Sequence, residues 1–132
     1  MKPILGIARA NFLLLPVTLV AVGAAAAAYE GAFDPLHTLL ALVGLTAMHA
    51  SVNSLNEYSD FRRGIDLATE RTPFSGGSGT LPSGDLPASA ALYLGLGAAF
   101  LGLMIGVYFL SLLGSRLLPI FILGAISVLG YS

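Results

Sequence analysis

Four long apolar runs cover most of this chain, and they restrict its fold more than any other feature of the sequence. They occupy residues 12–29, 36–55, 88–113 and 117–132. A helix needs about 20 mostly apolar residues to cross a bilayer core of roughly 30 Å, and a spanning segment must satisfy its own backbone hydrogen bonds. The runs therefore predict an all-α fold, a multipass transmembrane helical bundle of about four spans, in which the second helix continues to residue 58.

The composition excludes several other classes of protein. Of the 132 residues, 56% are hydrophobic and only 10% are charged, whereas soluble domains average roughly 45–50% apolar and about 25% charged residues. A net charge of −1 without a basic block gives no electrostatic surface for nucleic acid. The absence of cysteine excludes disulfides, thiol nucleophiles and thiolate metal sites.

Small residues in the third run favour close packing of helices. Gly95, Gly97, Gly102 and Gly106 leave room for another helix to approach, and Gly102 and Gly106 form a small-xxx-small pair. Pro16 in the first run is tolerable inside a packed bundle.

The basic residues predict the orientation. The N-terminal tail and the loop after the second span contain Lys2, Arg9, Arg62, Arg63 and Arg71. The charged residues of the loop after the first span are both acidic, Glu30 and Asp34. Because cytoplasmic loops are enriched in Lys and Arg, we expect an integral protein of the cell inner membrane with its N-terminus and loop 59–87 in the cytoplasm. Arg116, in the third loop, is the one residue against this orientation.

An alternative for the N-terminus is a secretory signal peptide, since basic residues precede an apolar stretch and an alanine run. Further apolar spans follow within a few residues, which favours the first helix of a bundle.

A stripe of polar residues marks the second helix. On an α-helix, with about 100° per residue, its members fall within an arc of roughly 100°. They are Thr46, His49, Asn53, Asn56, Glu57 and Asp60. Polar groups at membrane depth usually face a bundle interior and mark a functional site. Taken singly, His49 is more typical of a hydrogen-bonded packing residue than of a ligand, and His37 is expected at the interface.

The stripe ends in acidic residues whose spacing suits a cation. Glu57 and Asp60 share one helix face, and Gly64 can turn the chain so that Asp66 faces the same helix end. Mg²⁺ prefers such oxygen ligands together with substrate phosphates, and the nearby arginines, Arg62 among them, can bind phosphates. The pattern indicates a metal-bridged diphosphate. The alternative is a solvated helix end with weak surface ion pairs, which does not explain why the polar stripe continues inward.

The Gly-rich segment 73–84 has two interpretations. Consecutive backbone N–H groups in such turns can bind a phosphate, but the lysine of a Walker motif is missing. The other interpretation is a flexible linker.

The segment from Asn53 to Asp66 resembles the first aspartate-rich motif of the UbiA superfamily of intramembrane prenyltransferases. Asp66 comes six residues after Asp60 with Gly64 between them, which is closer to the 1,4-dihydroxy-2-naphthoate (menaquinone) branch than to the 4-hydroxybenzoate branch. Residues 69–73 and 9–16 are also similar to the family's post-motif arginine and the start of its first helix. The layout covers the whole chain, but the specific part is about fourteen residues.

The resemblance implies an enzyme that transfers a polyprenyl group from polyprenyl diphosphate to an aromatic acceptor in the bilayer, with Mg²⁺ as cofactor. It implies catalytic roles for Asp60 and Glu57. The implied metal ligands are Asn56, Glu57, Asp60 and Asp66, and the implied diphosphate-binding residues are Arg71, Asn53 and Arg62. Under this resemblance the Gly-rich segment would be a mobile cap over the cytoplasmic end.

Two departures from the family stand out. Glu57 occupies a position where the family usually has Asp, which keeps the charge and lengthens the side chain. The family has nine transmembrane helices and a second aspartate-rich motif, but after Thr72 this sequence has a single acidic residue, Asp85. We expect residues 1–132 to be the N-terminal part of a longer enzyme and to be inactive alone.

The sequence leaves one other function open and excludes two more. A small multipass transporter or assembly subunit could use the same polar stripe without diphosphate chemistry, and it remains the alternative. A CDP-alcohol phosphotransferase would need an Asp-Gly-x-x-Ala-Arg motif, which is missing. Soluble isoprenyl synthases are excluded by the composition.

Overall fold

The chain folds almost entirely into helices. The computed structural model describes residues 2–70, 72 and 77–130, and no strand occurs in these ranges. The elements are α1 (Lys2–Ile7), η1 (Ala10–Leu13), α2 (Leu14–Tyr29), α3 (Pro35–Arg62), α4 (Ile65–Ala68), α5 (Ala88–Leu113), η2 (Gly114–Arg116) and α6 (Leu118–Gly130). The prediction of an all-α fold is confirmed.

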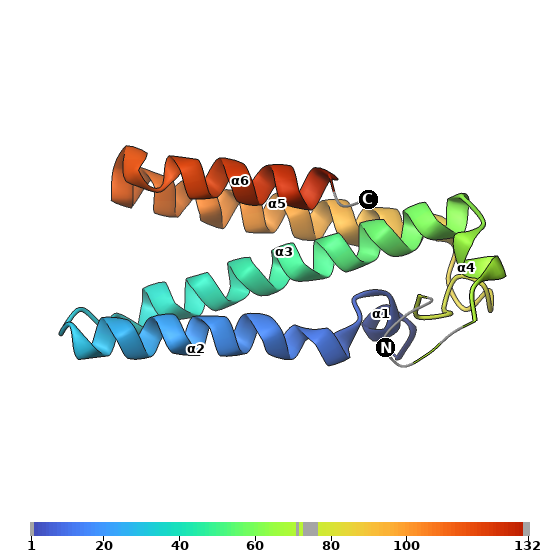
Figure 1. Ribbon diagram of the computed structural model, residues 1–132, viewed down its shortest axis with the longest axis horizontal. Helices are drawn as coiled ribbons and strands as arrows, with labels where there is room; N and C mark the ends of the chain where they lie inside the picture. Colours follow the sequence, from blue (N-terminus) through green and yellow to red (C-terminus); the bar gives the residue numbers. More distant parts are fainter. Residues whose placement is uncertain (1, 71, 73–76, 131–132) are drawn as a thin grey trace.

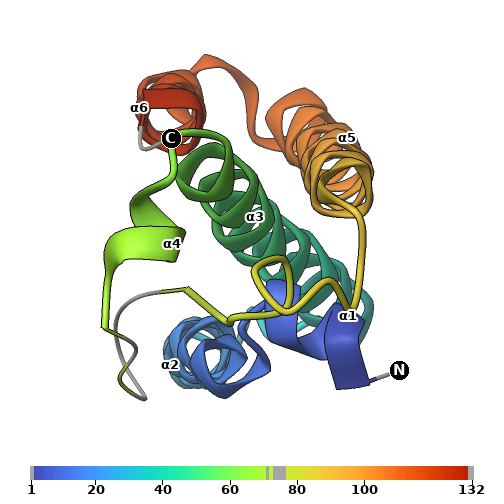
Figure 2. The same cartoon turned by 90° about the vertical axis from the view of Figure 1, so that its right-hand side faces the viewer.

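The four long helices form an antiparallel bundle in which successive helices alternate in direction (Figure 1). Seen along the bundle, α3 lies at the centre, with α2 on one side and α5 and α6 on the other (Figure 2). The most extensive packing is between α3 and α5. Ala10–Tyr29, Pro35–Arg62 and Ala88–Arg116 are long and apolar enough to cross a membrane, and Leu118–Ser127 is a shorter apolar helix.

Local sequence signals determine where α3 begins and ends. Asp34 caps the helix by accepting a hydrogen bond of 2.8 Å from the His37 backbone N–H, and Pro35 occupies the first turn. At the other end, Gly64 adopts a φ of 76°, in the left-handed region that favours glycine. This turn allows the chain to enter α4 beside the end of α3.

Two glycines of α5 allow the close approach to α3. A Cβ atom added to Gly95 would lie 2.7 Å from the Leu55 side chain, and one added to Gly102 would collide with Met48. A larger residue at either position would therefore force the two helices apart.

The other two glycines of the third apolar run, Gly97 and Gly106, do not pack against α3 in this way. Gly106 lies against the ring of Phe121 in α6, so the Gly102 and Gly106 pair serves two different neighbouring helices. Gly97 has open space around it, so none of the described helices uses the room that this glycine leaves.

The apolar core lies at one end of the bundle. Ile7, Leu81 and Ala91 are buried together, with the rings of Tyr58 and Phe61 packed against them. This core joins α1, the segment before α5, and the last turns of α3. The large apolar side chains of α2 and α5 remain mostly exposed along their length, as expected for surfaces that face lipid or other membrane helices.

Candidate functional site

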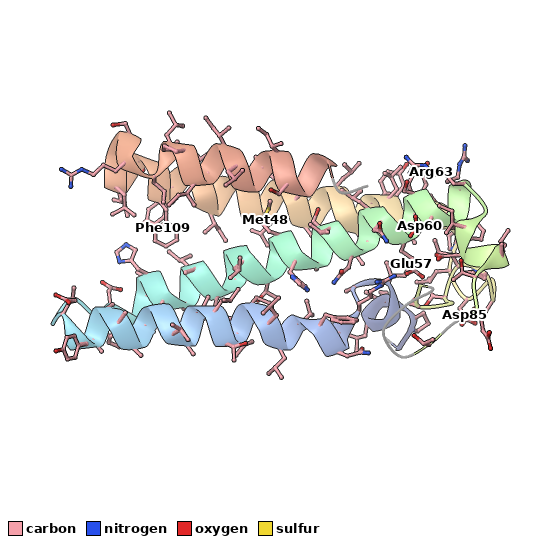
Figure 3. All side chains as sticks on the ribbon, in the orientation of Figure 1. Met48, Glu57, Asp60, Arg63, Asp85 and Phe109 are labelled. Carbon is pink, nitrogen blue, oxygen red and sulfur yellow. The ribbon has the colours of Figure 1, made fainter. Side chains whose placement is uncertain are left out.

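The polar stripe of α3 ends beside this core. Figure 3 shows Glu57, Asp60 and Arg63 at the same end of the bundle, with Asp85 of the loop before α5 nearby. The N-terminal segment and residues 77–87 lie at this end too (Figure 1). The site therefore combines the end of α3 with two segments that are distant in sequence.

Glu57 is fully buried and has several hydrogen-bond donors around it. The backbone N–H of Ser78 lies 3.0 and 2.9 Å from its two carboxylate oxygens, and the Ser78 hydroxyl lies 2.5 Å from Oε1. Arg9 Nε is 3.8 Å from Oε2. A buried carboxylate is costly unless it is paired and hydrogen-bonded, and these groups satisfy that requirement.

The chain turns at Arg9, between α1 and η1. A second polar residue of the stripe, Asn53, holds this corner. Asn53 donates a hydrogen bond of 3.0 Å from Nδ2 to the Ala8 carbonyl. Arg9 itself has a φ of 50°, a left-handed conformation that is strained for a residue with a side chain. Asn53 and Glu57 therefore hold a strained corner against α3.

Asn56 and Asp60 form a separate pair on the same helix. Asn56 Nδ2 donates a hydrogen bond of 2.9 Å to Asp60 Oδ2, and both residues are half-buried. This bond orients the two side chains next to each other and leaves Asn56 Oδ1 as an acceptor. Arg62 follows on the last turn and is exposed.

Asp66 reaches the site from α4 and is buried. Its carboxylate lies against the backbone of Gly77, where an added Cβ would come within 2.6 Å of Oδ2. Glu57 and Asp66 thus lie against neighbouring loop residues, whereas Asn56 and Asp60 contact each other. Arg71, the expected diphosphate ligand, lies outside the described residues.

The donor set can be compared with what Mg²⁺ requires. Within the described ranges, no three His, Asp or Glu side chains gather closely enough to hold a metal ion by themselves. Mg²⁺ is commonly bound by one or two carboxylates together with substrate phosphates and water. The half-buried Asp60 and Asn56 carry hard oxygen atoms of the kind that fits this smaller requirement.

His49 and Ser51 carry buried polar atoms without a partner in the described part of the chain. These atoms are His49 Nε2 and Ser51 Oγ. His49 lies on the polar stripe, less than two turns from Asn53. Because its buried Nε2 has no partner among the described residues, the structure gives no support for the hydrogen-bonded packing role expected of it.

The described part of the Gly-rich segment is folded onto the helices. Gly77 and Gly79 have φ values of 71° and 79°, which direct the Ser78 N–H towards Glu57 rather than towards an open cradle. Thr80 is buried, and its N–H donates to Ser78 Oγ at 3.1 Å. Residues 77–81 therefore do not behave as a linker, and residues 73–76 lie outside the described ranges.

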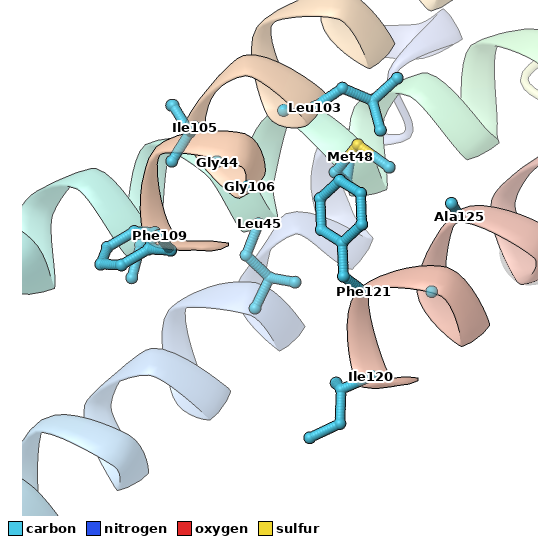
Figure 4. Close-up of a pocket in the computed structure, with 13 residues that line it drawn as sticks. Gly44, Leu45, Met48, Leu103, Ile105, Gly106, Phe109, Ile120, Phe121 and Ala125 are labelled. Atoms are coloured by element: carbon cyan, nitrogen blue, oxygen red, sulfur yellow. The ribbon is translucent and has the colours of Figure 1, made fainter. Parts of the chain in front are cut away.

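An apolar cavity of about 230 Å³ lies between α3, α5 and α6 (Figure 4). Its lining includes Leu45, Met48, Phe109 and Phe121. The lining contains none of Asn53, Asn56, Glu57 and Asp60, so this cavity is separate from the acidic site.

A second cavity, of about 510 Å³, lies between α2, α3 and α5 at the other end of the bundle. His37, on its lining, lies 3.1 Å from the Tyr108 hydroxyl and 3.2 Å from an Asp34 carboxylate oxygen. His37 therefore has two polar partners near the start of α3.

The sequence reasoning missed the partners of Glu57. In the sequence, Ser78 is one member of a Gly-rich segment, and Arg9 is a basic residue at the start of the segment that is similar to the family's first helix. Serine and threonine between glycines carry no signal for a particular partner. The long distance in sequence hides the Arg9 contact.

Comparison with known proteins gives one result. The sequence model of the UbiA prenyltransferase family matches residues 14–132, a range that includes α2 through α6 and the whole polar stripe. No curated protein and no solved structure gives a match.

Proposed function

Since the chain belongs to the UbiA prenyltransferase family, we propose that it provides the first acidic half of a Mg²⁺-dependent site that transfers a polyprenyl group from polyprenyl diphosphate to an aromatic acceptor. The family match over residues 14–132 is the observation that carries this proposal. The spacing of Asp60, Gly64 and Asp66 favours a 1,4-dihydroxy-2-naphthoate acceptor and a role in menaquinone biosynthesis.

The roles of the side chains follow from their positions. Asn56 Oδ1 and the Asp60 carboxylate hold the cation, on two side chains that the hydrogen bond from Nδ2 to Oδ2 keeps adjacent. Arg62, on the exposed last turn, binds phosphate oxygens. When bound, Mg²⁺ would neutralise charge on the diphosphate leaving group. Asn53 lines the substrate side of α3, and Arg71 is retained as a proposed diphosphate ligand. Asp66 is a further candidate metal ligand. Glu57, for which the resemblance implies the same role, has both oxygens bonded to Ser78, and its role is considered below.

We also propose that the protein lies in the inner membrane with its acidic end in the cytoplasm, where a diphosphate substrate is available. Two observations support this orientation. The N-terminal segment and loop 77–87 lie at the same end of the bundle, and this end carries most of the basic residues. Residues 1–132 alone are proposed to be inactive, because no second acidic motif follows Thr72 in this sequence.

The test uses the full gene product purified in detergent, with a polyprenyl diphosphate and 1,4-dihydroxy-2-naphthoate as substrates. Wild type is compared with Asp60→Asn and with Asp85→Asn, a matched change in an exposed acid at the same end. We expect Asp60→Asn to reduce kcat/KM by at least about 100-fold, the effect of a misplaced catalytic group, and Asp85→Asn to have little effect. Equal turnover in all three would contradict the assignment of Asp60.

A binding measurement separates this function from the alternative of a transporter or assembly subunit. Polyprenyl diphosphate should raise the Tm of the wild type only when Mg²⁺ is present, because the ligand binds through the metal. Protection that is independent of Mg²⁺ would favour transport or lipid binding.

A further inference from the structure

Glu57 makes contacts that a metal ligand at this site would not need. Both of its oxygens accept hydrogen bonds from Ser78, and its side chain is fully buried. Asn56 and Asp60 are half-buried and bonded only to each other among the contacts described. The acidic stripe therefore divides into a buried member that contacts the loop and an accessible pair.

We propose that Glu57 is a positioning residue, whose carboxylate fixes residues 77–81, here called the anchored loop, over the acidic end of α3. This role deepens the proposed function. Only the activity measurements described below depend on the proposed function, and the loop-exchange measurements do not. The anchor does not require a bound metal.

The hydrogen bonds around Glu57 show how the anchoring works. A backbone N–H and a hydroxyl from one residue converge on one carboxylate, an arrangement that fixes Ser78 in both position and direction. The Ser78 hydroxyl also lies 2.8 Å from Thr80 Oγ1, so the constraint extends along the anchored loop. Thr80 in turn packs against Gly6, where an added Cβ would lie 2.7 Å from Thr80 Oγ1.

Arg9 supplies the charge that makes the burial of Glu57 tolerable. Its side chain is 22% exposed and its Nε is 3.8 Å from Oε2. The same carboxylate therefore connects the corner before α2 with the segment before α5. Leu81, at the end of the anchored loop, is 3% exposed in the apolar core, which gives the loop a second attachment beside the hydrogen bonds.

Anchoring places the loop next to the proposed ligands. Asn56 and Glu57 are consecutive on α3, and Asp60 follows within one turn. A loop that is fixed to Glu57 therefore lies beside the Asn56 and Asp60 pair, where it can limit water and orient the diphosphate. Loss of the anchor should reduce catalysis through geometry and leave the affinity for Mg²⁺ unchanged.

The first experiment measures amide hydrogen exchange of the anchored loop without substrate or Mg²⁺, in the full gene product in detergent. The variants are Glu57→Gln, which keeps the side-chain shape, Glu57→Ala and Ser78→Ala. Glu30→Gln, an exposed acid at the opposite end, is the matched control. We expect exchange in residues 78–81 to increase about tenfold in Glu57→Ala, as expected for loss of a charge-assisted hydrogen bond. The increase should be smaller in Glu57→Gln and Ser78→Ala and absent in Glu30→Gln.

The second experiment measures the Mg²⁺ concentration that gives half-maximal turnover. We expect Glu57→Gln to lower kcat without changing this concentration, whereas Asp60→Asn should raise it at least about tenfold. Glu57→Asp keeps the charge but is one methylene shorter, so it should bind Mg²⁺ normally and still show faster loop exchange.

The outcomes separate the two proposals. Unchanged loop exchange in both Glu57→Ala and Glu57→Gln would overturn the anchoring role, and so would a shift in Mg²⁺ dependence in Glu57→Gln as large as in Asp60→Asn. If the wild type transfers no prenyl group, the proposed function fails, and the exchange experiment alone still decides whether Glu57 anchors the loop.

Discussion

Arg9 lies beside Glu57, with 3.8 Å between Nε and Oε2, although one residue precedes the first long helix and the other is near the end of the second. Removing one partner of a buried ion pair leaves a charge that has lost its water and its counterion. The hydrogen bonds from Ser78 reduce this penalty but do not supply a positive charge.

We therefore predict that Arg9→Gln lowers the stability of the bundle by about 1–3 kcal/mol. Arg9→Lys should lose less than half as much, because it keeps the charge. The apparent Tm in detergent, measured for both variants and for Arg116→Gln as a surface control, checks this prediction. Equal Tm values for Arg9→Gln and the wild type would show that the pair contributes nothing.

Gly102 is packed against α3 and Gly97 has open space around it, so replacing each with alanine should have opposite effects on stability. Gly102→Ala introduces a Cβ that collides with Met48 and lies 3.2 Å from the Gly44 carbonyl oxygen, so it should destabilise the protein by about 1–3 kcal/mol. Gly97→Ala has open space and should stabilise the helix by about 0.5–1 kcal/mol. Thermal unfolding of the two variants in one detergent tests the pair, and a loss of stability in Gly97→Ala that equals the loss in Gly102→Ala would contradict it.

The fold was largely predictable because it depends on local patterns. The apolar run 88–113 has the same bounds as α5. The predicted second helix, 36–58, lies within α3, which begins at Pro35 and continues to Arg62, so the first residues of the predicted loop 59–87 are helical. Helical periodicity alone also places Asn53, Asn56, Glu57 and Asp60 on one side of α3.

The division of that polar stripe could not be predicted. Whether Glu57 or Asp60 becomes buried depends on the path of a distant loop, and that path is set by the positive φ values of Gly77 and Gly79. Periodicity reports only which residues share a face of one helix. It contains no information about which segment, some twenty residues later, covers part of that face.

His37 and Tyr108 join α3 to α5 at the end of the bundle opposite the acidic site. His37 Nε2 is 3.1 Å from the Tyr108 hydroxyl, and the two rings are stacked with their centroids 6.0 Å apart. Tyr108→Phe removes the hydroxyl but keeps the ring, so it should cost about 0.5–1 kcal/mol.

A double-mutant cycle with His37→Phe measures this contact by itself. We expect a coupling of about 0.5 kcal/mol or more between the two sites. Additive effects would show that the hydrogen bond makes no contribution. Tyr93→Phe, in an exposed tyrosine of the same helix, is the matched control and should leave the Tm unchanged.

Asp34 makes the stability of the bundle depend on pH. The hydrogen bond that its carboxylate accepts from the His37 backbone N–H is the main cause that lowers the pKa of Asp34 below its ordinary value of 3.8. A lowered pKa in the folded state means that the folded state prefers the ionised carboxylate, so the group stabilises the protein above the unfolded pKa. This stabilisation is lost as the pH falls through the folded pKa, below 3.8.

We therefore predict that Asp34→Asn lowers the Tm at pH 6 and that the difference from wild type shrinks towards pH 3. Asparagine can still cap a helix, so the pH-dependent part reports the carboxylate charge and the constant part reports the cap. Glu30→Gln, at an exposed acid with no capping bond described, is the surface control. A difference for Asp34→Asn that stays constant from pH 6 to pH 3 would show that the charge of Asp34 does not stabilise the start of α3.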